Sequence, residues 1–421
     1  MNDTVESEAA DKVAKRPRPQ QHNPVTSSTI PQDHPVVDRR TQKQQRWEAK
    51  QQKQRQLQNK EEHRREWIAN NHTFACGVTA EDVPKVKQAI GTYRRGVSSG
   101  TIDFELERLC RILEPYVDLQ ERPGAQKFGA DPTAPDEDEE VLFVAEGTET
   151  VRLLLQQELS VARFMVPSVS VKSIFVKPSV LLDPPVSLVN EVEQLVPKRV
   201  GSFHVVVGTE DVQSLVVGFP ISRGALCCGI VPKFYWDEDW LYSYLSKLHS
   251  ELSKDKGRTP ILRVLALDGI TDTANLGSMI RSASAFGVHV IVLSPDCCDA
   301  WYRRSVRVSM GHIFRVPCVR VRSLAETLTK LRQEPYSIRS YAAVIDLKAN
   351  LILERMPRGS MDTSWCCIMG NEANGISKEV VSKSDFTLRI DMDEGVDSLS
   401  VPVATGILLH GLKEREAREN S

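Results

Sequence analysis

The chain has 421 residues, which is enough for two or more domains, and a formal net charge of −2. Because the molecule as a whole is not a polycation, any affinity for nucleic acid must come from local basic patches. No apolar run reaches the roughly 18 residues that a membrane-spanning helix needs, so the sequence predicts no membrane partner.

The nine cysteines follow no ligand or disulfide pattern, and none of them forms C-x-x-C. The sequence therefore predicts neither a metal site nor a disulfide framework. We expect an intracellular, reducing compartment, the cytoplasm or nucleus rather than an organelle. Acidic residues near the start argue against both a mitochondrial presequence and a secretory signal; they are Asp3, Glu6, Glu8 and Asp11.

Residues 1–70 are predicted to form a disordered to helical basic arm. Residues 1–37 are polar and interrupted by proline, so we expect them to be disordered. Residues 38–67 are rich in Gln, Lys and Arg and lack Gly and Pro, which favours a helix. This arm could lie along RNA phosphates. The alternative is a solvated charged helix, because four glutamates dilute the charge: Glu48, Glu61, Glu62 and Glu66.

Residues 71–140 are expected to be a helical segment followed by an acidic linker. Apolar residues recur at helical spacing within 79–122. The linker contains proline and ends in five acidic residues at 136–140, so a domain boundary is predicted at residue 141.

Residues 141–232 alternate between strand and helix patterns and predict a compact α/β domain. The expected strands are 141–144, 171–176, 204–207 and 224–231, and the expected helices are 149–157 and 188–195. Residues 233–260 are predicted to be a connector, with an amphipathic helix over 236–252.

The stretch 261–293 predicts a strand, a loop, a helix and a second strand, and hence a parallel sheet. Its loop lacks both the dinucleotide-binding and the P-loop glycine patterns, which disfavours a Rossmann methyltransferase or oxidoreductase. Instead, Asn275, Gly277 and Arg281 stand where the helix begins. Taken alone, this pattern is also compatible with a capping Asn and a solvated Arg.

Three later stretches also place charged or turn residues next to a predicted strand or helix. A basic segment holds Arg303, Arg304 and Arg307 and runs into a predicted strand over 313–316. An apolar strand at 366–369 leads into the Gly/Asn-rich loop 370–377. A further segment, 386–401, enters an apolar helix over 403–412.

Three of these stretches together resemble the motifs of the SpoU/TrmH branch of the SPOUT RNA methyltransferases. They are Asn275-x-Gly277-x-x-x-Arg281, the loop that begins at Gly370, and the segment that holds Ile390-Asp391-Met392 and Ser398-Leu399-Ser400-Val401. The resemblance covers 261–415 and implies a trefoil-knotted α/β domain. Glu146, Gly218 and Arg223 resemble, more weakly, the ribosomal-protein-like RNA-binding domain that precedes many of these domains. A generic small α/β domain is the alternative there.

The resemblance also implies roles for individual residues. The implied cofactor is S-adenosyl-L-methionine, and the implied cofactor-binding residues are Gly370, Ile390, Leu399 and Ser400. The implied catalytic residues are Asn275, Arg281, Glu372 and Ser398, and the RNA-binding residues are Arg303, Arg304, Arg307 and Arg223. Arg281 would hold phosphate and stabilise developing alkoxide charge, because a guanidinium is a poor base. Glu372 would hold its loop by accepting backbone N–H bonds, Ser398 would begin the last helix, and Gly370 would allow the close approach of the cofactor.

Three positions depart from the family pattern: Ala373, Asp391 and Ser400 stand where the family has Gly, Pro and Asn. The resemblance implies an α/β protein that forms a homodimer, for which Val403, Ile407 and Leu408 are the candidate apolar surface. The activity that it implies is 2′-O-methylation of ribose in structured rRNA or tRNA. The alternative is a catalytically impaired RNA-binding protein acting in ribosome assembly.

Overall fold

The computed structural model describes residues 39–72, 75–94, 103–119, 140–159, 166–185, 187–199, 201–221, 224–254 and 260–416. The predictions for residues 1–37, for most of the acidic linker and for Arg223 lie outside this part of the chain. The structure divides into two compact units, residues 1–61 and 62–421.

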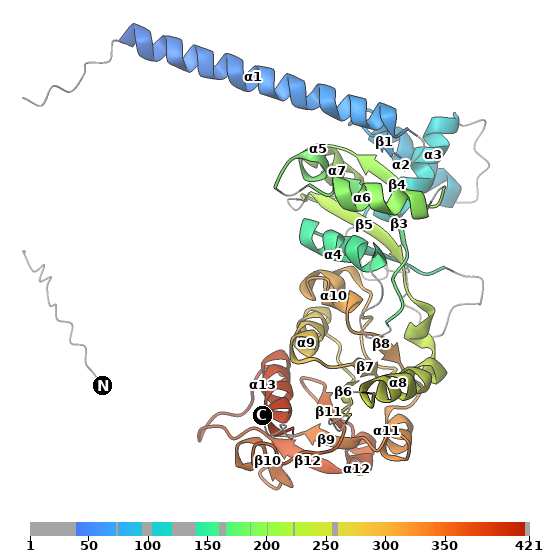
Figure 1. Cartoon of the computed structure of the whole chain (residues 1–421), viewed down its shortest axis with the longest axis vertical. Coiled ribbons are helices and arrows are strands. Elements are labelled where there is room, and N and C mark those ends of the chain that lie inside the picture. The colour runs from blue at the N-terminus through green and yellow to red at the C-terminus, as the bar shows by residue number, and fades with distance from the viewer. Residues whose placement is uncertain are drawn as a thin grey trace, which may run out of the picture. The chain divides into compact units, whose positions relative to one another are not determined.

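The first unit holds most of a single long helix, α1 (Arg39–Asn70), drawn in blue in Figure 1. From Gln44 to Glu61 its residues are exposed to solvent. A helix that is polar all round cannot be stabilised by burying an apolar face.

The second unit begins with a five-stranded sheet in the order β1-β4-β3-β5-β2. Its strands are β1 (Ala75–Gly77), β2 (Leu142–Glu146), β3 (Val171–Val176), β4 (His204–Val207) and β5 (Ala225–Ile230). In the described residues of this part the α-helices are α2 (Asp82–Arg94), α3 (Phe104–Leu113), α4 (Thr148–Leu159), α5 (Pro178–Leu182), α6 (Val189–Leu195) and α7 (Glu210–Val217). Short 3₁₀ turns follow at η1 (Glu114–Tyr116), η3 (Val196–Lys198) and η4 (Lys233–Trp236).

In the structure, this domain begins before residue 141, the boundary predicted from the sequence. β1 pairs in parallel with β4, and α2 and α3 share one apolar cluster with that sheet through Val86, Leu113 and Val206. The boundary predicted at residue 141 therefore separates elements that the structure joins in one sheet. A strand of three residues is too short to show an alternating pattern in the sequence.

The second sheet has seven strands, all parallel, in the order β10-β12-β9-β11-β6-β7-β8. They are β6 (Arg263–Asp268), β7 (Val290–Leu293), β8 (Cys318–Arg320), β9 (Arg339–Ala343), β10 (Leu351–Ile352), β11 (Trp365–Gly370) and β12 (Phe386–Arg389). The helices are α8 (Glu238–Leu252), α9 (Thr273–Phe286), α10 (Arg303–Val308), α11 (Leu324–Arg332), α12 (Lys378–Lys383) and α13 (Val401–Arg415), with 3₁₀ turns η5 (His312–Phe314) and η6 (Leu353–Arg355).

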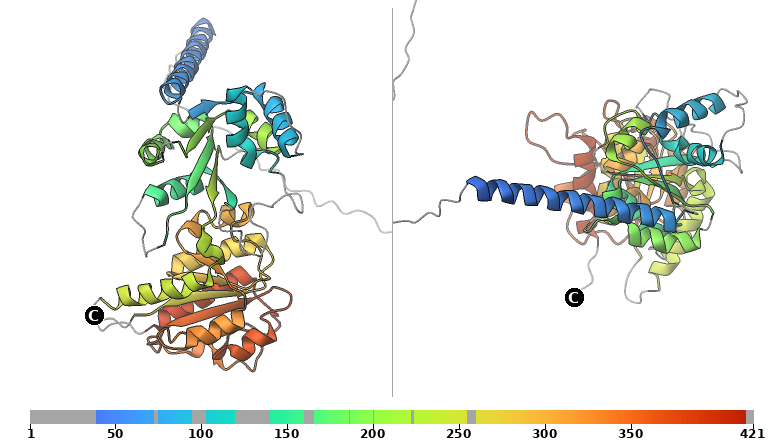
Figure 2. Two further views of the ribbon diagram at one scale, coloured as in Figure 1. Left: turned by 90° about the vertical axis from the view of Figure 1, so that its right-hand side faces the viewer. Right: turned by 90° about the horizontal axis from the view of Figure 1, so that it is seen from above.

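Helices cover both faces of this sheet (Figure 2). Leu265 and Leu267 of β6 join the cluster that includes Leu276 of α9 and Leu409 of α13. Val264, on the other face, joins the cluster that holds residues of α8, α11 and α12. Alternate strand residues are therefore buried on opposite faces, which is why the strands read as continuous apolar runs.

One predicted strand is wrong. Residues 313–316 do not form a strand, because Ile313 and Phe314 lie in the 3₁₀ turn η5, and the strand comes later at Cys318–Arg320. Gly311, with φ of +80°, turns the chain just before η5. A short apolar run can be buried by a helical turn as well as by a strand, so its pattern did not distinguish the two.

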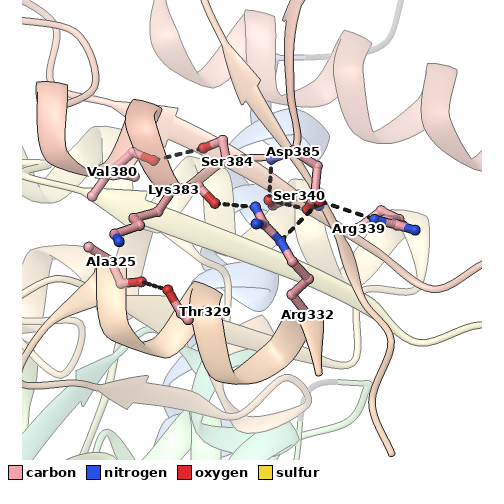
Figure 3. A network of polar contacts seen from close by, with 9 residues as sticks. All are labelled: Ala325, Thr329, Arg332, Arg339, Ser340, Val380, Lys383, Ser384 and Asp385. Atoms are coloured by element: carbon pink, nitrogen blue, oxygen red, sulfur yellow. Dashed lines mark hydrogen bonds and ion pairs between the residues drawn. The ribbon is translucent and has the colours of Figure 1, made fainter. Parts of the chain in front are cut away.

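A polar network fixes β9 and β12 against the helices on one face (Figure 3). Asp385 accepts hydrogen bonds from Ser340 N at 2.9 Å and Ser340 Oγ at 2.8 Å, and pairs with Arg332 Nε at 3.0 Å. Partial burial alone would raise the pKa of Asp385. The hydrogen bonds from Ser340 and the charge of Arg332 outweigh that effect, so the pKa lies below its usual value. The carboxylate therefore stays ionised and holds α11 and β9 to the start of β12.

A second anchor holds the end of α13. Arg263 donates to both carboxylate oxygens of Glu416, with Nε and Nη2 each at 2.6 Å, and Trp365 Nε1 donates to Oε1 at 2.9 Å. Glu416 is buried. This bidentate pair ties the residue after α13 to the beginnings of β6 and β11.

Candidate functional site

The loops that follow β6 and β11 meet at the carboxyl edge of the parallel sheet. Asp268, the last residue of β6, accepts a hydrogen bond from Ser377 N at 2.7 Å. Asn371 Nδ2 donates to the carbonyl of Gly269 at 2.7 Å, and Asn275 Nδ2 donates to Glu372 Oε1 at 2.6 Å. The structure thus brings together the first two predicted motifs. This edge is where α/β sheets bind ligands.

The first motif lies in the opening turns of α9. Asp272 is the N-cap and accepts from Asn275 N at 2.8 Å, so the helix begins earlier than the sequence pattern indicated and Asn275 is not the capping residue. Gly277 faces α10, where an added Cβ would lie 2.6 Å from the carbonyl oxygen of Ser305. Arg281 lies further along the helix and is exposed.

The second loop is held mainly by Asn371. Its Oδ1 accepts from Ala373 N at 2.9 Å and from Asn374 N at 3.1 Å, and its backbone exchanges two hydrogen bonds with Gly375. The role predicted for Glu372, accepting backbone N–H bonds, is therefore performed by Asn371. The sequence reasoning missed this residue, although an Asn that directly follows a glycine at the end of a strand is a turn signal that could have found it.

Gly370 is constrained by its own loop. A Cβ there would lie 2.3 Å from both Gly375 C and Ile376 N, so only glycine fits. The expected reason, close approach of the cofactor, is thus not the one that the structure shows. The left-handed residue of the loop is Gly375 (φ +66°), and Ala373 has no positive φ.

The third motif precedes α13. Ile390 is half-buried against the core, Leu399 is half-exposed, and Ser398 and Ser400 are exposed. The helix begins at Val401 with Ser400 at the N-cap position, which corrects the expectation that Ser398 begins it. The side chain of Ser400 makes no capping hydrogen bond. Asp391 accepts from Arg389 Nη2 at 2.8 Å.

The basic segment differs most from its predicted role. Arg303 Nη1 lies 3.1 Å from Glu146 Oε2, and Arg307 Nη1 lies 3.7 Å from the same oxygen. Glu146 is buried, and the Arg303 guanidinium also lies over the ring of Phe219. Arg303 therefore joins the two sheets of the second unit rather than presenting its charge to solvent. Arg304 is exposed.

His312 is a further residue near Arg281 that the sequence did not single out. Its Nδ1 lies 2.8 Å from Ser284 Oγ, and Ser284 is one helical turn from Arg281 on α9. Burial lowers the pKa of His312, and the charges of Arg315 and Arg281 lower it further. A lone histidine after glycine carries no signal for such a contact.

A cofactor held by backbone groups and apolar side chains fits this edge. The loop from Gly370 is folded tightly onto the end of β11, where no Cβ is tolerated, and Ile390 and Leu399 keep apolar surface that is not fully buried. In the described part of the chain, no group of three or more His, Cys, Asp or Glu side chains is placed to bind a metal. None of the described helices is both long enough and apolar enough to cross a membrane.

Comparison with known proteins agrees with this geometry. The model of the SpoU rRNA methylase family matches residues 263–410. The 23S rRNA (guanosine(2553)-2'-O)-methyltransferase RlmP of Bacillus subtilis is 31% identical over 151 residues, which are 36% of this chain and 58% of that protein. The 23S rRNA (guanosine-2'-O-)-methyltransferase RlmB of Blochmanniella floridana is 36% identical over 181 residues, 43% of this chain and 65% of that protein.

The chain thus spans less than two thirds of the length of these curated relatives. One similar solved structure is an AdoMet-bound rRNA methyltransferase from Sinorhizobium meliloti. The alignment covers 80% of this chain and 97% of the Sinorhizobium meliloti chain. Its identity is 20% and its TM-score 0.50, so it supports the fold alone. The residues that match the family model include the seven-stranded parallel sheet and the loops that follow β6 and β11. Residues 263–410 of this chain therefore constitute a domain of the SpoU rRNA methylase family.

Proposed function

We propose that this chain transfers a methyl group from S-adenosylmethionine to a ribose 2′-hydroxyl in structured rRNA or tRNA. The observation that carries the proposal is the hydrogen bond from Asn275 to Glu372, which joins the loops after β6 and β11 and fixes the helix that bears Arg281. The names of the relatives, which are rRNA 2′-O-methyltransferases, support the same reaction class.

In this proposal the chain holds and orients its reactants. S-adenosylmethionine, when bound, supplies a methyl group on a cationic sulfonium. Residues at the ends of β11 and β12 would hold it: Gly370 through its loop backbone, and Ile390 and Leu399 through apolar contact. Arg281 is exposed and permanently charged, so it can bind an RNA phosphate and stabilise the oxyanion that forms on the ribose.

We also propose that two copies pair through α13 and that the C-terminal segment forms the trefoil knot of the family. Val403 and Ile407 are 52% and 37% exposed and lie one helical turn apart on α13, so they offer one shared apolar surface that a second copy could cover. Leu408, predicted for the same surface, is buried within its own chain and does not contribute.

The test is methyl transfer to total rRNA and tRNA with an isotopically labelled donor, followed by mapping of 2′-O-methyl positions. We expect Arg281→Ala to abolish transfer while cofactor affinity, measured by calorimetry, is retained. Arg358→Ala is the control, because Arg358 is exposed and its Nη1 lies 3.9 Å from Glu414 Oε2, outside the two loops that carry the proposal. A chain that binds RNA but transfers no methyl group to any RNA would overturn the proposal in favour of a purely RNA-binding role.

A further inference from the structure

Three positive charges in the exposed part of α1 lie in a line. Arg46, Lys50 and Lys53 follow one another at steps of four and three residues, whereas Arg55 lies on the opposite side of the helix. Because an α-helix has about 3.6 residues per turn, steps of four and three residues return to the same face. We call Arg46, Lys50 and Lys53 the basic stripe. It extends over about 10 Å, at a rise of about 1.5 Å per residue.

Acidic residues are sparse around the basic stripe. In the sequence from Arg46 to Lys53 the only acidic residue is Glu48, which lies on the opposite side of the helix and accepts from Gln44 Nε2 at 3.2 Å. All three residues of the stripe are exposed. The net charge of the whole chain is −2, so this positive face is a local feature and not a consequence of composition.

The same geometry argues against other partners of a long helix. Steps of four and three residues are those at which a coiled coil places apolar side chains, and here they carry like charges that would repel a second copy. A membrane surface needs a continuous apolar face. The large apolar side chains of the segment, Trp47 and Leu57, lie ten residues and about 15 Å apart along the helix, so they form no continuous apolar face. Polyanions remain as the complementary surface.

We propose that the basic stripe of α1 contacts the phosphate backbone of structured RNA, as a second RNA-binding surface separate from the 263–410 domain. Glutamines flank the stripe, and their amide groups can donate to phosphate or ribose oxygens without adding charge. Contacts of this kind add affinity and position the RNA, but they carry little information about base sequence. Their strength falls with salt, because phosphate neutralisation releases counterions.

The sequence offers a matched test, because residues 50–53 read Lys-Gln-Gln-Lys. In the transposed variant, Lys50→Gln/Gln51→Lys/Gln52→Lys/Lys53→Gln, composition and net charge are unchanged but two charges leave the stripe. Lys and Gln have similar helix propensity, so α1 should persist, which circular dichroism checks. The neutralised variant, Lys50→Gln/Lys53→Gln, removes the same two charges outright.

Binding of the full chain to bulk tRNA and to a short RNA duplex is measured over a range of salt concentrations. We expect both variants to bind more weakly. The slope of log affinity against log salt concentration should become smaller by roughly 1 to 2, because each lost phosphate contact removes about 0.7 to 0.9 from it. The loss should be similar for both RNAs. Cofactor affinity should not change, and because the readout is binding, the result does not depend on whether the chain methylates RNA.

Two outcomes would overturn the proposal. If the transposed variant binds like the parent while the neutralised variant is weakened, the helix acts through total charge and not through a stripe. If neither variant changes the affinity or the salt slope, α1 does not contact RNA.

Discussion

Asn275 in α9 and Glu372 in the loop after β11 are 97 residues apart in the sequence and are joined by a hydrogen bond of 2.6 Å. The amide donates and the carboxylate accepts, so the bond is charge-assisted. Together with the bond from Asn371 to Gly269, it makes the two loops one unit at the edge of the sheet.

This pair predicts a specific coupling. Asn275→Asp places a second carboxylate against Glu372, so it should destabilise the protein more than Asn275→Ala does. Glu372→Gln should relieve that repulsion in the double variant. A double-mutant cycle of unfolding free energies in urea should give a coupling of about 1 kcal/mol. Simple additivity of the two single changes would show that the bond does not hold the loops together.

The second prediction concerns where the cofactor binds. Leu399→Glu should weaken S-adenosylmethionine binding in calorimetry while leaving the urea midpoint nearly unchanged, because Leu399 is half-exposed and a charge there would have to be desolvated by the cofactor. Substitution of Gly370 is a poor test. Its Cβ would strike the backbone of Gly375 and Ile376, so even Gly370→Ala should lower stability. Unchanged affinity in Leu399→Glu would move the cofactor site elsewhere.

The outcome for individual residues shows what sequence patterns can resolve. Long buried strands such as β6 and β11 were predictable because their apolar runs are bounded by turn residues. The family resemblance singled out Asn275 and Glu372 but did not predict that they pair. Asn371 holds its loop through contacts within four residues, so its turn signal could have identified it. Glu146 as the partner of Arg303 was not predictable, because that pair depends on which distant segment folds against β2, and no local pattern encodes that.

The third prediction uses Gly277. An added Cβ would lie 2.6 Å from Ser305 O and 3.1 Å from Ser309 N, both backbone atoms of α10 and its end, so α9 and α10 would have to separate. Gly277→Ala should therefore destabilise the protein by about 1 to 3 kcal/mol, the usual cost of overpacking. The control is Gly406→Ala in α13, where the nearest atom is Ser282 Oγ at 3.9 Å. That change should be neutral or stabilising by helix propensity. Equal urea midpoints for both variants would contradict this account.

The fourth prediction concerns the ion pair between the two sheets. Phe143 of β2 packs against Trp301, with ring centroids 4.8 Å apart, and Glu146 lies beside Arg303 in the same contact. Glu146→Gln leaves the largely buried Arg303 guanidinium without its carboxylate, and removing one partner of a buried pair costs about 3 kcal/mol or more. Glu140→Gln is the matched control, because Glu140 and its partner Lys172 are both exposed and such pairs contribute about 0 to 1 kcal/mol. If Glu146→Gln costs no more than Glu140→Gln in urea unfolding, the buried pair does not hold the sheets together.

The last prediction is a pH dependence of stability at His289. Burial, and then the charge of Arg263, lowers the pKa of His289 to about 3. Its Nδ1 accepts a hydrogen bond from Arg263 N at 3.0 Å, which requires the neutral ring. In the unfolded chain the pKa returns to about 6.5. Below that pH the unfolded state binds a proton that the folded state does not bind.

The contribution of His289 is therefore complete above about pH 6.5 and is lost as the pH falls from there toward 3. From pH 7 to pH 5 the loss should be about 2 kcal/mol, because each unit below the unfolded pKa costs about 1.4 kcal/mol. His289→Asn removes the titrating group but keeps an oxygen that can accept from Arg263 N. The difference in unfolding free energy between the parent and this variant should shrink by about 2 kcal/mol over that range, since the other titrating groups are present in both proteins and cancel. A difference that stays constant between pH 7 and pH 5 would mean that His289 is protonated as readily in the folded chain as in the unfolded one.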